Sequence, residues 1–166
     1  GVRGQAAERL DLPFRRGCTL SVDDVLEAIE KKSAVVGVIG LGYVGLPLVR
    51  EFAQAGFRVW GFDVDPEKVR KLESGQSYIQ HIPAELISDL VSSKRFRPTC
   101  DFDLLAEVDA IVICVPTPLT IHREPDTSYV ESTARSIAKT LRPGQLVVLE
   151  STTYPGTTRE IMLPVL

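Results

Sequence analysis

The stretch from Val35 to Asp63, V-V-G-V-I-G-L-G-Y-V-G-L-P-L-V-R-E-F-A-Q-A-G-F-R-V-W-G-F-D, decides the fold that we expect for this chain. It opens with an apolar run, residues 35–39, whose length and β-branched content are typical of a buried parallel strand. Three glycines follow with the spacing G-x-G-x-x-G, namely Gly40, Gly42 and Gly45. Apolar residues at helical spacing come next, and we expect them to face the core: Val44, Leu48 and Phe52. A stop glycine (Gly56) and a second strand at residues 58–62 lead to the acid Asp63.

Each part of this stretch suits the binding of a dinucleotide. Gly40 permits a tight strand-to-helix turn, Gly42 lets the backbone approach a pyrophosphate, and Gly45 allows the helix to pack closely on the strand. The free N–H groups and the positive dipole end of the helix favour phosphate charge. Asp63 is placed to accept a hydrogen bond from a ribose hydroxyl. Because all parts occur in order, we predict a dinucleotide cradle rather than a glycine-rich turn of some other α/β domain.

The acid at the end of the second strand indicates which dinucleotide is bound. A carboxylate at Asp63 would repel the 2′-phosphate of NADP, and the adjacent residues offer no arginine to replace it. Arg58 and Lys68 are the nearby positive charges that oppose this preference. We therefore predict NAD as the cofactor.

The rest of the chain alternates strands with helices, which predicts a single α/β domain with a doubly wound, Rossmann-like parallel sheet. The further strands are expected at residues 96–99, 110–115 and 145–150, and the helices start at Asp65-Pro66, Pro83, Asp101 and Asp126. Residues 1–33 are expected to be an N-terminal extension with a short amphipathic helix. That helix begins at the capping-box-like S-V-D-D of Ser21 and carries one apolar stripe (Val22, Val25, Leu26 and Ile29). Residues 34–166 form the expected NAD-binding domain.

Composition excludes several classes of function. A chain of 166 residues is long enough for one domain with a core. Its net charge of −3, without a basic stripe, argues against nucleic acid as a partner. No apolar run approaches the roughly 20 residues that cross a bilayer, and no signal-peptide core is present, so we expect a cytoplasmic protein without a membrane partner. The cysteines (Cys18, Cys100 and Cys114) lack C-x-x-C spacing, which argues against a zinc site and a disulfide framework. No metal is predicted.

Ligands bind beyond the carboxyl ends of the strands in such sheets. Four loops are expected there: residues 40–45, 63–65, 116–118 and 151–157. The last two are rich in Thr and Pro, which gives rigid backbones that present hydroxyl groups. For any single threonine, turn chemistry alone remains the alternative.

Five motifs in order together resemble the UDP-glucose/GDP-mannose dehydrogenase family: G-L-G-Y-V-G-L-P-L, G-F-D-V-D-P-E-K-V, C-V-P-T-P-L, P-D-T-S-Y-V and L-E-S-T-T-Y-P-G-T-T. The resemblance runs from Ala34 to the end, about four-fifths of the chain. The segments S-Y-I-Q-H-I, H-R-E-P-D and E-S-T-T-Y-P-G-T look most like the branch that oxidises UDP-N-acetylhexosamines, UDP-N-acetylglucosamine in particular. UDP-N-acetylmannosamine, UDP-glucose and GDP-mannose are the alternative substrates.

The resemblance implies oxidation of the sugar C6 alcohol to a carboxylate by two NAD, through an active-site cysteine. It also implies roles for particular residues. The pyrophosphate would be touched by Gly40, Gly42, Tyr43, Val44 and Gly45. Asp63 would bind the adenine ribose with Lys68 beside it, and the dinucleotide path would be lined by Val115, Pro116, Thr117 and Pro118. Thr152 would sit near the nicotinamide and help to place a catalytic water; the sequence reads S-T-T-Y-P where the family has an S-T-V-P-like segment.

Several parts of the family pattern do not occur in these 166 residues. They are the glutamates, lysine and asparagine of the catalytic site, the glycine-rich cysteine motif, the central dimerisation helix and the domain that grips UDP. None of the three cysteines fits the nucleophile motif. We therefore expect the cofactor domain of a longer, homodimeric enzyme, inactive by itself and of open oligomeric state. A stand-alone NAD-sensing module without chemistry is the competing interpretation.

Overall fold

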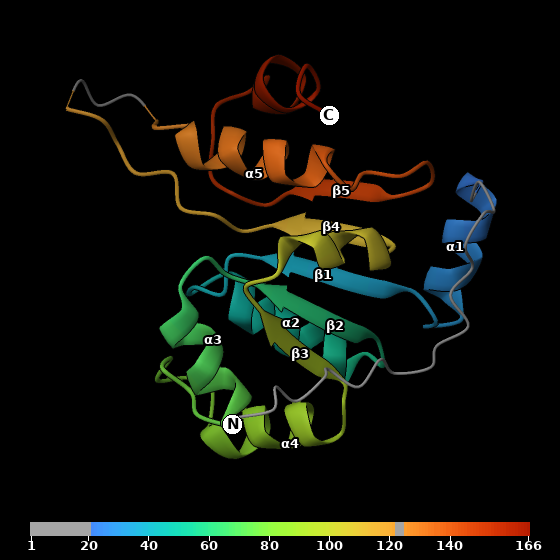
Figure 1. The fold of residues 1–166 in the computed structure, drawn as a ribbon, viewed down its shortest axis with the longest axis vertical. Helices are drawn as coiled ribbons and strands as arrows, with labels where there is room; N and C mark the ends of the chain where they lie inside the picture. The colour runs from blue at the N-terminus through green and yellow to red at the C-terminus, as the bar shows by residue number, and fades with distance from the viewer. Residues whose placement is uncertain (1–20, 122–124) are drawn as a thin grey trace, which may run out of the picture.

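A computed structural model of the chain describes residues 21–121 and 125–166, and residues 1–20 of the expected extension, with Cys18, lie outside the described residues. Its centre is a five-stranded, fully parallel sheet with the order β3-β2-β1-β4-β5 (Figure 1). The strands are β1 (Val35–Ile39), β2 (Arg58–Phe62), β3 (Phe96–Thr99), β4 (Ala110–Ile113) and β5 (Leu146–Leu149). The sequence prediction of the first three strands is confirmed.

The fourth and fifth strands are shorter than predicted. Ladder pairing continues just past β4, because the amide of Cys114 still donates to the carbonyl of Ile39 at 2.8 Å. The partner strand β1 ends at Ile39 and Pro116 has no N–H to donate, so the ladder stops here and β4 ends at Ile113 instead of the expected Val115. The fifth strand runs over residues 146–149 instead of 145–150.

Helices cover both faces of the sheet, which confirms the doubly wound α/β class. One face is packed by α1 (Val22–Glu30), α2 (Gly45–Gln54), α3 (Pro66–Glu73) and α4 (Ala84–Ser92). The opposite face is packed by η1 (Phe102–Glu107), α5 (Ser128–Ala138) and η2 (Thr158–Met162). The expected short helix capped by Asp101 is a 3-10 helix, and the last helical segment is a π turn.

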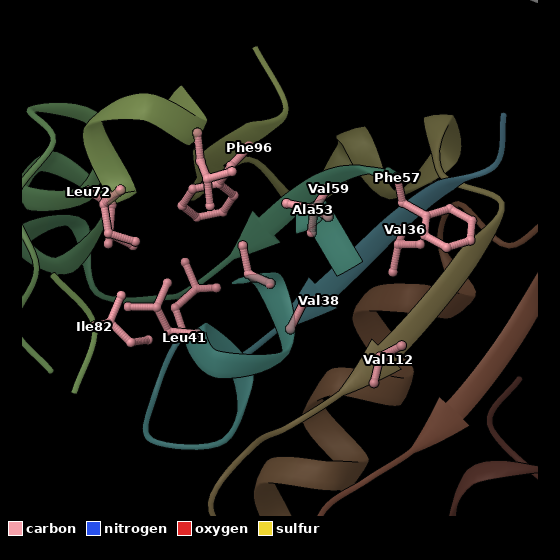
Figure 2. Close-up of a cluster of buried hydrophobic side chains, with 14 of the residues drawn as sticks. Val36, Val38, Leu41, Ala53, Phe57, Val59, Leu72, Ile82, Phe96 and Val112 are labelled. Carbon is pink, nitrogen blue, oxygen red and sulfur yellow. The ribbon is translucent and has the colours of Figure 1, made fainter. Parts of the chain in front are cut away.

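Alternate residues of the strands enter separate cores, as the two-residue period of a strand requires. Val36 and Val38 of β1 point into the core under α2 and α4, which Figure 2 shows with Leu41 and Phe96. Val35 and Ile39 of the same strand enter the core under α5 and η1. Every residue of β1 is buried, as a central parallel strand should be.

Two predictions of helix faces need correction. In α2 the fully buried side is formed by Leu46, Val49 and Ala53, while Leu48 and Phe52 pack only partly and Val44 is 55% exposed. The close approach of Gly45 to the carbonyl of Gly40 places the face of α2 that carries Val49 and Ala53 against the sheet, one residue along from the expected stripe.

In α1 the predicted capping box is present, since the Ser21 side chain accepts from the amide of Asp24 and the Asp24 side chain accepts from the amide of Ser21. Only part of the predicted stripe reaches the core. Val25 is buried, whereas Val22 and Leu26 are 75% and 53% exposed. Among the described residues, no helix is both long and apolar enough to cross a membrane.

Candidate functional site

The candidate site lies along the carboxyl edge of the sheet, to which all the arrowheads in Figure 1 point. From β1 the chain continues to β2 and β3 on one side of the sheet, and from β4 it continues to β5 on the other side. The strand order therefore reverses between the neighbours β1 and β4. Such a switch point is where open α/β sheets bind ligands. The turn after β1 (residues 40–45) and the segments after β2, β4 and β5 meet there.

Gly40 forms the base of the turn and admits no side chain. Its φ is +91°, in the left-handed region, and its amide donates to the carbonyl of Phe62 at 2.7 Å. A Cβ atom at this position would lie 2.6 Å from the carbonyl oxygen of Cys114. The turn therefore packs directly against the backbone that follows β4 and is hydrogen-bonded to the last residue of β2.

The other two glycines of the triplet face opposite constraints. A Cβ at Gly45 would lie 1.8 Å from the carbonyl oxygen of Gly40, so the first turn of α2 approaches the loop backbone directly. A Cβ at Gly42 would meet nothing within 4 Å. A side chain at Gly45 would therefore collide with the turn, whereas the space next to Gly42 is open.

The backbone above that turn offers hydrogen-bond donors. Within the described part of the chain, the amides of Gly42, Tyr43 and Val44 donate to no protein acceptor. The side chains of Tyr43 and Val44 are 84% and 55% exposed, so they leave the amides uncovered by the core. Free amides at the start of α2, where the helix dipole is positive, form a suitable site for a phosphate group.

Asp63 is a buried acid at the end of β2, only 5% exposed. Its Oδ2 accepts from the amide of Leu41 at 2.8 Å and its Oδ1 accepts from the amide of Asp65 at 3.0 Å. Lys68 lies beside it, with Nζ 3.5 Å from Oδ2. A carboxylate has about four lone-pair positions, so these contacts leave capacity to accept from a ribose hydroxyl.

The segments after β4 and β5 are held together by two hydroxyl groups. Thr117 Oγ1 donates to the carbonyl of Thr152 at 2.5 Å, and Ser151 Oγ donates to the carbonyl of Val115 at 2.8 Å. The sequence placed Val115, Thr117 and Thr152 in these segments but gave no role to Ser151. Thr152 is exposed, and its own hydroxyl has no hydrogen-bond partner among the described residues. Pro116 and Pro118, both exposed, flank Thr117.

Neither described cysteine has the character of a nucleophile. Burial, reinforced by the charge of Glu150, raises the pKa of Cys114 to about 11. The pKa of the exposed Cys100 is also raised, first by desolvation and then by Asp63 and Asp65. Both thiols therefore stay protonated near neutral pH. Among the described residues, no group of three or more His, Cys, Asp or Glu side chains is arranged to hold a metal ion.

Comparison with known protein families identifies the family of this chain. Residues 34–166 match the NAD binding domain of the UDP-glucose/GDP-mannose dehydrogenase family. The chain belongs to this family. It is 36% identical over 135 residues to UDP-N-acetyl-D-glucosamine 6-dehydrogenase of Pseudomonas aeruginosa, which covers 81% of this chain and 31% of that protein. It is 40% identical over 129 residues to UDP-N-acetyl-D-mannosamine dehydrogenase of Escherichia coli K12, covering 77% and 30%.

A solved structure of a family member agrees with the fold. A ternary complex of GDP-mannose dehydrogenase from Pseudomonas aeruginosa superposes with a TM-score of 0.74 at 30% identity, over 78% of this chain and 31% of that chain. This chain thus spans about 30% of the length of the dehydrogenases that it matches. It is an NAD-binding domain of the family.

The sequence did not predict the hydrogen bonds that Leu41, within the turn, makes with Asp63 and Tyr78. Leu41 donates its amide to Asp63, and its carbonyl accepts from the hydroxyl of Tyr78 at 2.5 Å. Tyr78 belongs to the S-Y-I-Q-H-I segment, which the sequence used only to choose a family branch. No local signal links the two residues, because they are 37 positions apart.

Proposed function

We propose that this chain supplies the NAD site of a nucleotide-sugar 6-dehydrogenase, which oxidises the C6 alcohol of a UDP-sugar to a carboxylate with two NAD. UDP-N-acetylglucosamine is the preferred substrate, since a UDP-N-acetyl-D-glucosamine 6-dehydrogenase is among the relatives. UDP-N-acetylmannosamine, UDP-glucose and GDP-mannose are the alternatives. The whole enzyme is proposed to be a cytoplasmic homodimer.

One observation carries the cofactor part of this proposal. The open space over Gly42 and the carboxylate of Asp63 lie around one turn, together with the amides of residues 42–44, which have no acceptor among the described residues. The amides would hold the pyrophosphate, with Gly40 and Gly45 shaping the backbone beneath it. Asp63 would accept from the adenine ribose while Lys68 balances its charge. NAD, when bound, supplies the group that accepts hydride from the alcohol.

The joined segments after β4 and β5 would define the nicotinamide end of the site. Val115, Pro116, Thr117 and Pro118 would line the dinucleotide path. The bond from Thr117 to the backbone of Thr152 fixes both segments. The free hydroxyl of Thr152 is then available to orient a water or an alcohol, which is why it is the one catalytic residue proposed here. An NAD-sensing module would not require such a hydroxyl.

The experiment is to incubate this polypeptide with NAD and UDP-N-acetylglucosamine and to follow both NAD binding and NADH formation. We expect NAD binding without NADH formation, because the nucleophilic cysteine motif and the UDP-gripping domain of the family do not occur in these residues. Sustained, UDP-sugar-dependent NADH formation would contradict the proposed division of labour. Failure to bind NAD would contradict the proposed site.

A further inference from the structure

We propose that Tyr78 is a positioning residue of the NAD site, which sets the direction of the Gly42 amide by donating a hydrogen bond to the carbonyl of Leu41. This inference rests on the proposed role of the turn at residues 40–45 as the pyrophosphate site. Tyr78 does not belong to that turn. It lies in the segment between α3 and α4 and reaches the turn through space.

Leu41 is the residue of the 40–45 turn whose side chain is buried in the core. Its side chain is fully buried, and a Cβ placed at Gly61 would come within 2.8 Å of Leu41 Cδ2 and 2.7 Å of Phe96 Cε2. Figure 2 shows the Leu41 side chain in the core beside the start of α2, with Ile82 and Phe96 in the same cluster. The side chain of Leu41 is therefore packed closely over Gly61 of β2 and beside Phe96 of β3.

The backbone of Leu41 is held on both sides. Its amide donates to Asp63 at 2.8 Å, and its carbonyl accepts from Tyr78 Oη at 2.5 Å. The carbonyl of Leu41 and the amide of Gly42 belong to one planar trans peptide, in which C=O and N–H point in opposite directions. A carbonyl held toward Tyr78 thus turns the Gly42 amide away from Tyr78, and within residues 21–121 and 125–166 this amide has no acceptor.

Tyr78 is itself well fixed. Its neighbours Ile79 and Ile82 are buried, and the hydroxyl of Ser77 accepts from the amide of Ile79 at 3.2 Å. Burial raises the pKa of Tyr78 strongly, and the charges of Asp63 and Asp65 raise it further. The phenol therefore keeps its proton and remains a donor throughout the physiological range of pH.

The test compares Tyr78→Phe, which removes only the hydroxyl, with the unaltered chain. We expect Tyr78→Phe to weaken NAD and ADP-ribose binding about threefold to tenfold, the range for the loss of one hydrogen bond. Adenosine, which has no phosphate to meet the turn, should lose affinity less than twofold. In the ligand-free protein, exchange of the Leu41 amide with solvent should accelerate, while the amide of Val59 in the sheet should keep its protection.

Two control variants separate positioning from general loss of structure. Tyr129→Phe removes a half-exposed hydroxyl on α5 that has no hydrogen-bond partner among the described residues. Ile137→Val shortens a buried side chain on the opposite face of the sheet and lowers stability without touching the turn. Both should bind NAD like the unaltered chain.

Equal affinity of Tyr78→Phe and the unaltered chain for NAD would overturn the inference. A parallel loss of adenosine and ADP-ribose affinity would also overturn it, because the hydroxyl would then support the domain in general. Absence of NAD binding by the unaltered chain would instead contradict the proposed function, so the two failures are distinguishable.

Discussion

Gly42 and Gly45 illustrate how identical residues in one motif meet different physical demands. Gly45 is required by the protein itself, because any side chain would collide with the carbonyl of Gly40. A Cβ at Gly42 would meet nothing within 4 Å, so the fold itself does not require a glycine there, and we propose that its missing side chain leaves room for the pyrophosphate. The spacing of the motif predicted both roles, and the structure gives each glycine its own observable consequence.

Alanine substitutions separate these two demands. Gly45→Ala should destabilise the domain by about 1–3 kcal/mol or more, because the new Cβ lies 1.8 Å from backbone that cannot move aside. Gly42→Ala should change the free energy of unfolding by no more than about 1 kcal/mol. It should nevertheless weaken NAD binding about tenfold by occupying the open approach to the amides. Urea unfolding and calorimetric titration of both variants measure these effects; normal NAD affinity in Gly42→Ala would contradict the placement of the pyrophosphate.

The thiol of Cys114 should react with iodoacetamide only at high pH. Its pKa of about 11 lies above the unfolded value, because burial and Glu150 disfavour the thiolate in the folded state. The neutral thiol therefore contributes stability below the unfolded pKa, and this contribution is lost as the pH rises toward 11. Peptide mass mapping at pH 8 should show Cys100 labelled well before Cys114, since Cys100 is exposed. Faster labelling of Cys114 would contradict the described burial.

At the scale of elements, apolar runs were sufficient to predict the strands, whereas helix faces were not. β1, β2 and β3 have the predicted bounds because turn glycines and polar residues flank these strands in the sequence. α2 and its N-cap carry apolar residues over more than one stripe, because the expected set (Val44, Leu48 and Phe52) and the buried set (Leu46, Val49 and Ala53) both have helical spacing. Only packing against the sheet distinguishes the two sets.

The capping box of α1 gives a prediction at this scale. Ser21→Ala should lower the stability of α1 by about 1 kcal/mol, because the amide of Asp24 loses its acceptor. Hydrogen exchange should accelerate in residues 22–30 and stay unchanged in the strands, because α1 is joined to the core mainly through Val25, Ala28 and Ile29. Ser136→Ala on the exposed side of α5 is the control, with an effect within about 0.5 kcal/mol. Unchanged exchange in α1 after Ser21→Ala would show that the cap does not support the helix.

The contacts that assemble the site could not be predicted from sequence. Tyr78 meets Leu41 across 37 residues, and Thr117 meets Thr152 across 35. Nothing in the local pattern around these residues marks their partners. The motifs placed the four loops at one edge, and the structure shows which hydroxyl groups and amides hold them there.

For the whole molecule, the parallel sheet brings the segments that follow β1, β2, β4 and β5 to one edge, where we propose that the glycine turn and Asp63 bind the adenosine half of NAD. The neighbouring segments after β4 and β5, joined by Thr117 and Ser151, are proposed to meet the nicotinamide half. The chain spans about 30% of the length of its relatives, and the four loops that we propose to bind NAD all lie within it.

The most direct test of this account is a calorimetric titration of the chain with NAD and, separately, with NADP. NAD should bind at least about tenfold more tightly, a difference of about 1.4 kcal/mol. The reason is that the 2′-phosphate of NADP would approach the carboxylate of Asp63, whose neighbouring cation, Lys68, is already paired with it at 3.5 Å. NADP binding as tight as NAD or tighter would contradict the central claim that Asp63 and the glycine turn form an NAD site.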